Sequence, residues 1–349
     1  EWGWHMLKAL GYVYMDQKEE YLLAIETYER LLAYNPFSSE APEVQKNIVD
    51  CYRILEDDAN AFVARQKLFL KYKAGTAWWN ANTSEEVKLK AYRLAEKSAR
   101  ENINELTQKA NQRGKTELYQ KVLELSSTYL DAFPEDKHAY MIRWNTALIL
   151  DTKLQHYKEA LQQYLTISMV YNTEEYKEFA REMGLASIQD AATNAIVVAD
   201  TMVRQESRRS GRQIKEAQAM DFKVALTERA PVPLTASESW LAMSYDNYIK
   251  LFPFEPNTPN ILSSAVALYY THNQFTEALK YFKTLIKYFP DSDEVDNAQY
   301  SILESYFGKN DFQSVEFLAK RILSSDASDE IKQKAQQRLA EAIFLNAES

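Results

Sequence analysis

Apolar residues recur every three or four positions along most of the chain, which is the spacing of one face of an α-helix. Residues 24–36 read AIETYERLLAYNP and residues 278–290 read ALKYFKTLIKYFP. Each stretch carries an alanine, an aromatic residue four positions later, a leucine three further on and a proline five after that. Proline lacks an amide N–H and clashes with the preceding helical turn. Each stretch is therefore predicted to be a helix that stops at Pro36 or Pro290.

Another amphipathic helix is predicted ahead of each of these two. Gly11 and Tyr14 precede the polar turn DQKEEY, and Val266 and Tyr269 precede the turn THNQF. The same order of elements, with fewer of the marked residues, recurs at 39–73, 137–171 and 302–322. A repeated helix–turn–helix unit cannot bury its apolar face alone, so we expect the copies to stack on one another.

These copies resemble tetratricopeptide repeats, and the resemblance covers about half of the chain well. Small residues such as Gly11, Ala24, Ala160 and Ala278 stand where two helices of such a repeat approach closely. The resemblance implies an all-α fold, an α-solenoid or superhelix of antiparallel helix pairs with about sixteen helices. Whether it forms one continuous superhelix or two lobes stays open at this point.

Two longer helices interrupt the repeats in the middle of the chain. Thr83 followed by Glu86 reads as a capping box that starts one of them. Asn172 with Glu175 is predicted to start the second, which runs from about 173 to 205. The segment 228–236 contains two prolines and is predicted to be a linker or hinge. We therefore expect an N-terminal part at 1–227 and a C-terminal part at 237–349.

Composition narrows the class of protein. Of 349 residues, 46% are hydrophobic and 26% are charged, as in folded proteins, but only 7 are glycine. All-β folds and phosphate-binding loops use glycine heavily, so both are disfavoured. The net charge of −9 disfavours nucleic acid as a partner, because phosphate binding needs a basic surface. The absence of an apolar run of about 18 residues predicts no transmembrane segment.

Glu1, rather than Met, is the first residue of the chain. We therefore expect a processed or trimmed product, and membrane association only through a partner or through a lipid anchor that this sequence lacks.

Residues that could carry chemistry are scattered. Cys51 is the single cysteine, so it can form neither an internal disulfide nor a cysteine-based metal site. No histidine has a His or Cys partner at helical ligand spacing; the four are His5, His138, His156 and His272. Neither a Gly-x-Ser-x-Gly elbow nor a Gly-x-x-x-x-Gly-Lys loop occurs. We expect a protein that is not an enzyme and that uses no cofactor and no metal.

The concave face of a tetratricopeptide array is lined by the first helix of each pair, so the resemblance implies that a peptide or partner protein binds there. Taking Leu262, Val266 and Leu303 as core positions, the opposite side of the first helices is predicted to be this face. The candidate partner-binding residues are Lys8, Tyr12, Asn260, Ser264, Tyr270, Asn297, Tyr300 and Glu304. They mix tyrosine with amide, hydroxyl and charged groups, which suits contact with a peptide.

Two further features give secondary candidates. Trp78 and Trp79 form a double tryptophan in a predicted loop, where they could anchor a partner or pin the loop to its neighbours. Arg208, Arg209 and Arg212 belong to a basic segment that could bind an acidic partner or form an ordinary solvated helix face.

Members of the tetratricopeptide family hold other proteins together, so the resemblance implies a non-enzymatic scaffold or adaptor. The carboxylate clamp of chaperone-binding members needs Lys and Asn in one groove. Lys8 and Asn145 lie in distant copies, so the pattern does not predict binding to chaperone C-termini.

The stretch 275–307 is also similar to repeats of bacterial envelope proteins of the outer-membrane assembly lipoprotein and Tol-Pal-associated type. This similarity implies the periplasm or outer membrane of a Gram-negative bacterium, with the cytoplasm as the alternative. The alternative function is the non-catalytic superhelical part of an envelope enzyme such as a lytic transglycosylase. The Glu-Ser pairs of this chain lack the Gly-Leu-Met-Gln run that follows the catalytic glutamate of such enzymes.

Overall fold

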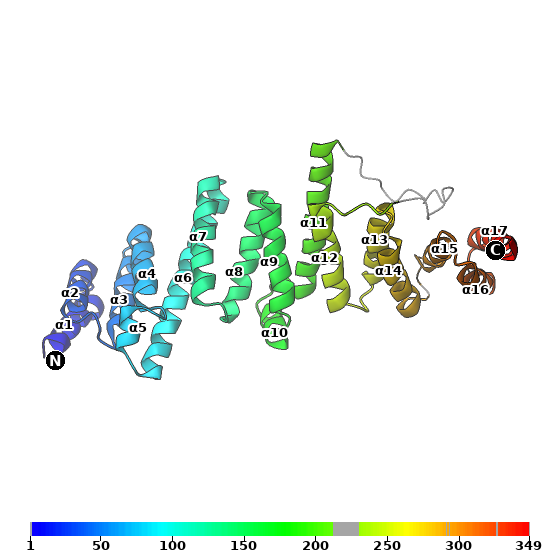
Figure 1. The fold of residues 1–349 in the computed structure, drawn as a ribbon. Coiled ribbons are helices and arrows are strands. Elements are labelled where there is room, and N and C mark those ends of the chain that lie inside the picture. Colours follow the sequence, from blue (N-terminus) through cyan, green and yellow to red (C-terminus); the bar gives the residue numbers. More distant parts are fainter. Residues whose placement is uncertain (1, 212–229, 291, 293, 326, 349) are drawn as a thin grey trace. The chain divides into compact units, whose positions relative to one another are not determined.

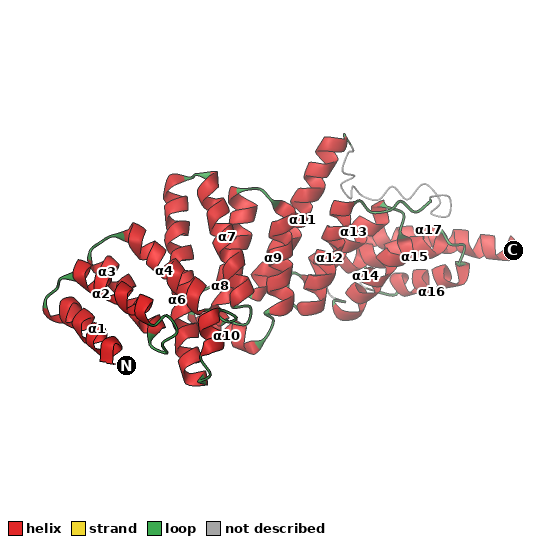
Figure 2. Ribbon diagram, turned by 60° about the vertical axis from the view of Figure 1, so that its left-hand side comes forward, coloured by secondary structure: helices red, strands yellow, loops and turns green. Residues whose placement is uncertain are grey.

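The structure is a computed structural model that describes residues 2–211, 230–290, 292, 294–325 and 327–348. All regular secondary structure within these residues is helical, with seventeen α-helices, two π-helical segments and no strand (Figure 2). The predicted all-α solenoid of helix pairs is confirmed, with one helix more than expected. The chain divides into two compact units, unit 1 at Glu1–Gln155 and unit 2 at His156–Ser349.

Unit 1 is a row of helices in which each packs mainly against its neighbours in the sequence (Figure 1). Its α-helices are α1 (Trp2–Tyr12), α2 (Tyr21–Tyr34), α3 (Ala41–Ile54), α4 (Asp58–Tyr72), α5 (Ala77–Ala81), α6 (Glu85–Arg113), α7 (Thr116–Ala132) and α8 (Lys137–Leu148). A π-helical turn extends α1 over Val13–Gln17, and another extends α8 over Ile149–Lys153.

Unit 2 follows the same plan, with α11 packed between α9 and α12 and the later helices in sequence order. Its helices are α9 (Tyr157–Val170), α10 (Glu174–Glu182), α11 (Ile188–Ser210), α12 (Ala236–Leu251), α13 (Thr258–Thr271), α14 (Phe275–Tyr288), α15 (Glu294–Phe307), α16 (Phe312–Leu323) and α17 (Asp329–Glu348). No helix among the described residues is long and apolar enough to cross a membrane.

One turn geometry recurs before α2, α4, α9, α14 and α16. In each case a residue with φ between 55° and 57° stands two positions ahead of the helix; these residues are Glu19, Glu56, Gln155, Asn273 and Asn310. Non-glycine residues seldom adopt this left-handed conformation. Because it recurs at the same place, the five helix pairs share one turn conformation. They include the copies at 39–73 and 302–322, which have few of the residues that mark the repeat.

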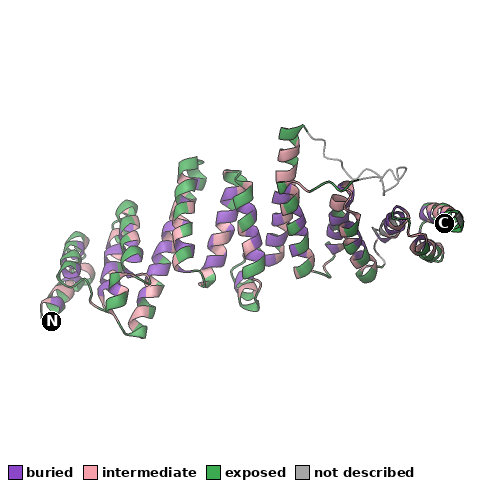
Figure 3. Ribbon diagram, viewed as in Figure 1, coloured by how far each residue is buried: buried purple, intermediate pink, exposed green. Residues whose placement is uncertain are grey.

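The residues that mark the repeats are buried between neighbouring helices (Figure 3). Tyr28 of α2 is 1% exposed, and its ring lies against Gly11 of α1. A Cβ atom at Gly11 would lie 2.4 Å from ring atom Cε1 of Tyr28, so only glycine fits there without a shift of the ring. The predicted function of this small residue, close helix approach, is confirmed.

The prediction of one long helix from about 173 to 205 is wrong, because the helix is interrupted between α10 and α11. Gly184 has a φ of +62° and donates its N–H to the carbonyl of Arg181, while Leu185 donates to that of Ala180. This is a Schellman motif, which ends a helix. Ser187 and Asp190 then form a capping box that starts α11.

Two predicted helix starts are each displaced by one residue. Ser84, and not Thr83, caps α6 by accepting a hydrogen bond from the amide of Val87. Thr173, and not Asn172, is the N-cap position of α10, and its side chain makes no capping bond.

The predicted linker at 228–236 does not coincide with the division between the units. Residues 228 and 229 lie outside the described residues, but 230–235 lie within unit 2. The amide of Val232 donates to the carbonyl of His272 at 2.8 Å, and the side chain of Gln274 donates to Val232 at 2.7 Å. Helices α11 and α12, on either side of this segment, pack against each other. The hinge therefore remains a prediction without support from this packing.

Candidate functional site

A groove with a volume of about 480 Å³ lies in unit 1 between α1, α3 and α6. These are the first helices of the pairs α1/α2, α3/α4 and α6/α7, which is where the repeat pattern predicts a binding face. The groove is lined by Lys8, Glu40, Glu43, Val44, Lys46, Asn47, Lys90, Arg93 and Leu94.

The amphipathic pattern of α3 aims its polar side chains at the groove. Gln45 and Ile48 are buried against neighbouring helices, whereas Glu43, Lys46 and Asn47 lie on the other side of the helix at spacings of three and four residues. Pro42 stands in the first turn, where its missing N–H removes no helical hydrogen bond.

Helix α6 supplies the other wall. Ala91 and Ala95 are fully buried, so the small residues of α6 face its packing partners. Lys90 and Arg93 leave the opposite side of the helix and are exposed. Leu94 stands beside them and gives the groove an apolar patch.

Cations outnumber carboxylates in the lining by four to two. Lys46 pairs with Asp50 at 2.6 Å and Lys90 pairs with Glu86 at 3.0 Å, and neither of these carboxylates lines the groove. The hydrogen bond from Lys90 to Glu86 raises the pKa of Lys90. Arg93 makes no ion pair with any described residue. The lining residues alone thus carry two more positive than negative charges, and Arg93 is the cation among them without an ion pair to a described residue, on a chain whose net charge is −9.

Lys8 is the one primary candidate that lies in this groove. Its Nζ donates to Oε1 of Glu40 at 2.5 Å, and Trp4 donates from Nε1 to Oε2 of the same carboxylate at 2.6 Å. The hydrogen bonds from Lys8 and Trp4 lower the pKa of Glu40. Tyr12 is 57% exposed on α1 but does not line the groove.

The sequence did not single out Lys46, Asn47, Lys90 or Arg93. The signal for the first two was present, because the polar stripe of α3 has the same helical spacing as the stripe of α1 that contains Lys8. For Lys90 and Arg93 no such signal exists, since α6 carries none of the repeat's marked residues. The groove lining therefore combines Lys8 with Asn47, and not with Asn145.

In unit 2 the predicted face is only partly accessible. Asn260 and Ser264 are exposed on α13, as expected. Tyr270 is 7% exposed and packs edge-on against Phe275, with ring centroids 5.0 Å apart. The prediction that Tyr270 lines an open face is therefore wrong.

The two candidates on α15 are buried as well. Tyr300 and Glu304 are 6% and 3% exposed. Arg338 of α17 donates from Nε to Glu304 at 2.6 Å and from a terminal nitrogen at 3.1 Å, and its guanidinium covers the ring of Phe307. Helix α17 thus occupies the side of α15 that was predicted to be free. The side chain of the remaining candidate, Asn297, lies outside the described residues.

Trp78 and Trp79 lie in the short helix α5 and not in a loop as predicted. Trp78 anchors this helix and is not available to a partner. It is 3% exposed, donates from Nε1 to the carbonyl of Ser38 at 2.7 Å, and meets the ring of Tyr72 edge-on. Of the two readings of the double tryptophan, pinning is confirmed for Trp78. Trp79 remains partly exposed, with Nζ of Lys88 5.8 Å from its ring centroid.

Arg208 and Arg209 are exposed in the last turn of α11, where cations favour the negative end of the helix dipole. The helix ends at Gly211, whose φ is +65°. Arg212 lies outside the described residues.

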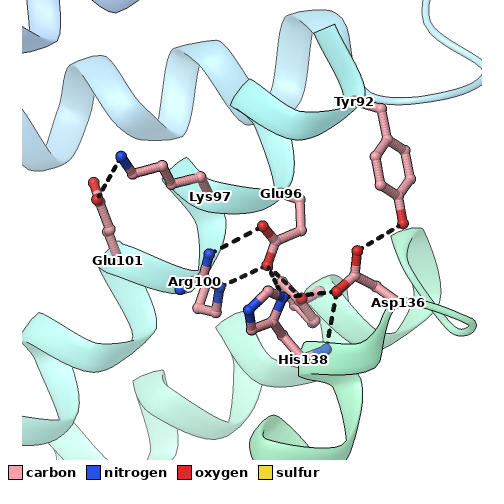
Figure 4. A network of polar contacts seen from close by, with 8 residues as sticks. Tyr92, Glu96, Lys97, Arg100, Glu101, Asp136 and His138 are labelled. Atoms are coloured by element: carbon pink, nitrogen blue, oxygen red, sulfur yellow. Dashed lines mark hydrogen bonds and ion pairs between the residues drawn. The ribbon is translucent and has the colours of Figure 1, made fainter. Parts of the chain in front are cut away.

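A second polar cluster in unit 1 joins α6, α7 and the start of α8 (Figure 4). Arg100 donates to both carboxylate oxygens of Glu96, at 2.7 and 3.2 Å, and Tyr129 donates to Oε1 at 2.7 Å. Tyr92 donates to Asp136 at 3.1 Å, and Nδ1 of His138 lies 2.9 Å from Asp136. Burial and the Glu96 carboxylate raise the pKa of Tyr129 far above its usual value, so it stays a neutral donor.

Glu96, Asp136 and His138 bring their ligand atoms within 4.8 Å of one another, a geometry that could in principle hold a metal ion. No sequence pattern pointed to this cluster, because Glu96 in α6 stands 40 residues or more before Asp136 and His138 at the start of α8. A divalent cation placed there would face the Arg100 guanidinium, which already neutralises Glu96. The cluster is therefore best explained as a hydrogen-bonded connection between helices.

No family model matches this chain, and no curated protein matches it. Solved structures do. A tetratricopeptide repeat protein from Parabacteroides merdae is 13% identical over 98% of this chain and 100% of its own, with a TM-score of 0.29. The TPR domain of P58(IPK) is 13% identical over 99% and 98%, with a TM-score of 0.26. Yeast Tom70 is 14% identical over 98% and 89%, with a TM-score of 0.27.

TM-scores at this level carry no argument for function. The solenoid class rests instead on the helix pairs of this chain, on their shared turn and on the buried marker residues. The matched structures also give no support to the resemblance to bacterial envelope proteins.

Proposed function

We propose that this chain is a non-enzymatic scaffold for protein–protein interaction and that the groove of unit 1 binds an acidic segment of a partner protein. The observation that carries the proposal is the convergence of Lys8, Lys46, Lys90 and Arg93 from three helices on one groove. Asn47 adds an amide that can contact a peptide backbone, and Leu94 adds apolar area.

Electrostatics favour a carboxylate-bearing partner at this place. The chain as a whole carries a charge of −9, so it repels acidic segments from most of its surface. A carboxylate about 4 Å from a cation near a protein surface gains roughly 4 kcal/mol of Coulomb energy before desolvation and screening. Arg93 can offer a flat two-pronged donor, which matches the shape of a carboxylate.

The lining favours binding over catalysis. The lining contains no serine, threonine, cysteine or histidine, so it offers none of the Ser–His or Cys–His pairs used in nucleophilic catalysis. The exposed amide and hydroxyl of Asn260 and Ser264 on α13 provide a second polar surface, in unit 2, that we propose for contacts with a protein partner.

A charge-neutralising double variant tests the groove. Lys90→Gln with Arg93→Gln removes two exposed cations of the groove, so binding should weaken about 2- to 30-fold. The probe is a fluorescein-labelled hexaglutamate peptide, followed by fluorescence anisotropy at low salt. The matched control, Lys71→Gln with Lys121→Gln, makes the same charge change on α4 and α7, outside the groove.

The proposal predicts that the control binds the peptide as the unaltered chain does, and that hexaglutamine is not bound. Equal weakening by both double variants would show a general charge effect and would remove the groove from the account. Absence of any binding to hexaglutamate would refute the acidic-segment proposal itself.

We further propose the periplasmic or outer-membrane-associated envelope of a Gram-negative bacterium as the place of action, with the cytoplasm as the alternative. Support comes from the sequence similarity of 275–307 alone. Fractionation of the native host with an antibody against this chain decides between them, and recovery in the cytoplasmic fraction would refute the envelope proposal.

A further inference from the structure

One cation of the groove, Lys8, already forms an ion pair with Glu40. Its carboxylate bridges two donors, Nζ of Lys8 at 2.5 Å and Nε1 of Trp4 at 2.6 Å. We propose that Glu40 is a resident carboxylate that competes with the partner's carboxylate for Lys8 and so lowers the affinity of the groove for acidic segments. This inference rests on the proposed function of the groove.

The position of Glu40 suits an exchangeable contact. It stands immediately before α3, and its own amide donates to Oγ of Ser38 at 3.3 Å, so its backbone is held while its side chain reaches across to α1. The side chains of Lys8 and Glu40 are 44% and 37% exposed. A pair so open to water separates at small cost, because solvent replaces the lost contact.

Trp4 makes the exchange easier still. It is 6% exposed and therefore holds its indole N–H in a fixed place. When an incoming carboxylate takes Lys8, Glu40 keeps the hydrogen bond from Trp4 and is not left without a donor. The released Glu40 stays beside the groove as a negative charge, which opposes the ligand.

Glu43 provides the internal comparison. It lines the same groove and carries the same charge, but it makes no ion pair with any described residue. Glu43 therefore acts on a ligand only through its field, whereas Glu40 also blocks a particular cation. A double-mutant cycle with Lys8 distinguishes the field effect of a carboxylate from the blocking of Lys8.

The structure accordingly assigns different tasks to the cations. Arg93, on α6, makes no ion pair with any described residue and can meet an acidic segment directly, whereas Lys90 meets it by exchange with Glu86. Lys8 binds a carboxylate of the partner only after its ion pair with Glu40 has separated. An acidic segment long enough to reach from α6 to α1 would thus gain Lys8 at the expense of the Lys8–Glu40 pair.

Binding of labelled hexaglutamate to five variants tests this by anisotropy: Glu40→Gln, Lys8→Gln, Glu43→Gln, Glu40→Gln with Lys8→Gln, and Glu43→Gln with Lys8→Gln. Glu40→Gln keeps an acceptor for Trp4 while removing the charge, and it should tighten binding about two- to fivefold. That gain should become smaller in the Lys8→Gln background, because no cation remains to be released and only the field effect of the lost charge is left. Glu43→Gln should give the same factor with and without Lys8.

Lys8→Gln alone gives an independent reading that does not require Glu40 to be altered. Because Glu40 masks Lys8, the loss should be smaller than that caused by Arg93→Gln, which removes a cation that makes no ion pair with any described residue. Circular dichroism of each variant checks that the helices are intact.

Two results would overturn the inference while leaving the groove proposal standing. One is binding of hexaglutamate in the groove with no tightening by Glu40→Gln. The other is a gain that persists unchanged when Lys8 is absent, which would show a field effect only. Failure of the unaltered chain and of every variant to bind the peptide would refute the proposed function, and this inference with it.

Discussion

Gly11→Ala is the substitution that the packing of the helix pairs resists most clearly. Gly11 lies in α1, where its backbone faces the ring of Tyr28 in α2. A Cβ atom built at Gly11 would lie 2.4, 2.8 and 2.9 Å from three ring atoms of Tyr28. Contacts below 3.0 Å do not occur for real Cβ atoms, so either the ring or α1 must move. Tyr28 is 1% exposed, which leaves the ring no free space to enter.

The magnitude follows from two opposing effects. One extra methyl group in a well-packed interface costs about 1–3 kcal/mol through displaced neighbours. Alanine in place of glycine within a helix stabilises it by about 0.5–1 kcal/mol, because an alanine backbone loses less conformational entropy on folding. The expected net loss is about 1–2 kcal/mol for the opening of the α1/α2 pair.

Amide hydrogen exchange read by mass spectrometry measures this opening locally, without assuming that 349 residues unfold in one step. A loss of about 1.4 kcal/mol should make the amides of α1 and α2 exchange about tenfold faster. Gly3→Ala is the matched control in the same helix. Its Cβ would lie 3.2 Å from the hydroxyl of Tyr34, the far end of a side chain that is 60% exposed, so exchange should stay the same or slow slightly.

Equal exchange in Gly11→Ala and Gly3→Ala would refute the reasoning, because the two differ only in what the new methyl group meets. The clash is also tested by pairing Gly11→Ala with Tyr28→Leu, which shortens the facing side chain. The two changes together should cost less than the sum of the single losses.

Three more predictions follow from other contacts. Glu304→Ala, measured by urea unfolding, should cost about 2–4 kcal/mol, since it leaves the largely buried guanidinium of Arg338 without its main carboxylate. Trp78→Ala should cost about 3–5 kcal/mol by the same measurement, because a nearly fully buried ring and its hydrogen bond are lost. Burial raises the pKa of Tyr28 and of Tyr245 to about 12, above the value of about 10 in an unfolded chain. The contribution of these two tyrosines to stability should therefore be fully present below about pH 10 and be lost as the pH rises through 12. Circular dichroism reports the helices, and tyrosinate absorbance reports the ionisation of the tyrosines.

A control variant or a specific result can refute each of these three predictions. Glu330→Ala removes the partner of an exposed pair and should leave the stability nearly unchanged. A loss from Glu304→Ala that is no larger than the loss from Glu330→Ala would refute the buried pair. Trp79→Ala, at a partly exposed ring, should cost clearly less than Trp78→Ala. Full tyrosinate absorbance near pH 11 with intact helices would contradict the burial of the tyrosines.

The core was largely predictable, because its signal is local and repeated. Ala24, Tyr28 and Leu31 hold the same positions as Ala278, Phe282 and Leu285, and all six are buried. A helix must bury such a stripe against whatever neighbour the repeat supplies, so spacing alone is enough. The break at Gly184 was equally visible in the sequence, in a glycine followed by the Ser187 and Asp190 capping box, but the alanine-rich pattern on both sides obscured it.

The candidate site was harder to predict, because helical spacing gives the direction of a side chain but not what stands in front of it. Tyr300 and Glu304 do leave α15 on the expected side, yet α17 brings Arg338, 34 residues from Glu304, onto that side. The same limit hid the groove, since Lys8 lies far in sequence from Lys90 and Arg93. Only the packing of α1, α3 and α6 brings these charges together.

The central claim, that an acidic segment binds between α1, α3 and α6, is tested most directly by locating a bound peptide. A hexaglutamate peptide carrying a benzophenone group is photo-crosslinked to the full chain, and the attached residues are mapped by mass spectrometry. The account predicts attachment on α1, α3 and α6 around Lys8, Lys46 and Arg93, with loss of the signal when Lys90→Gln and Arg93→Gln are combined. Attachment at other helices, or a signal that hexaglutamine reproduces, would contradict it.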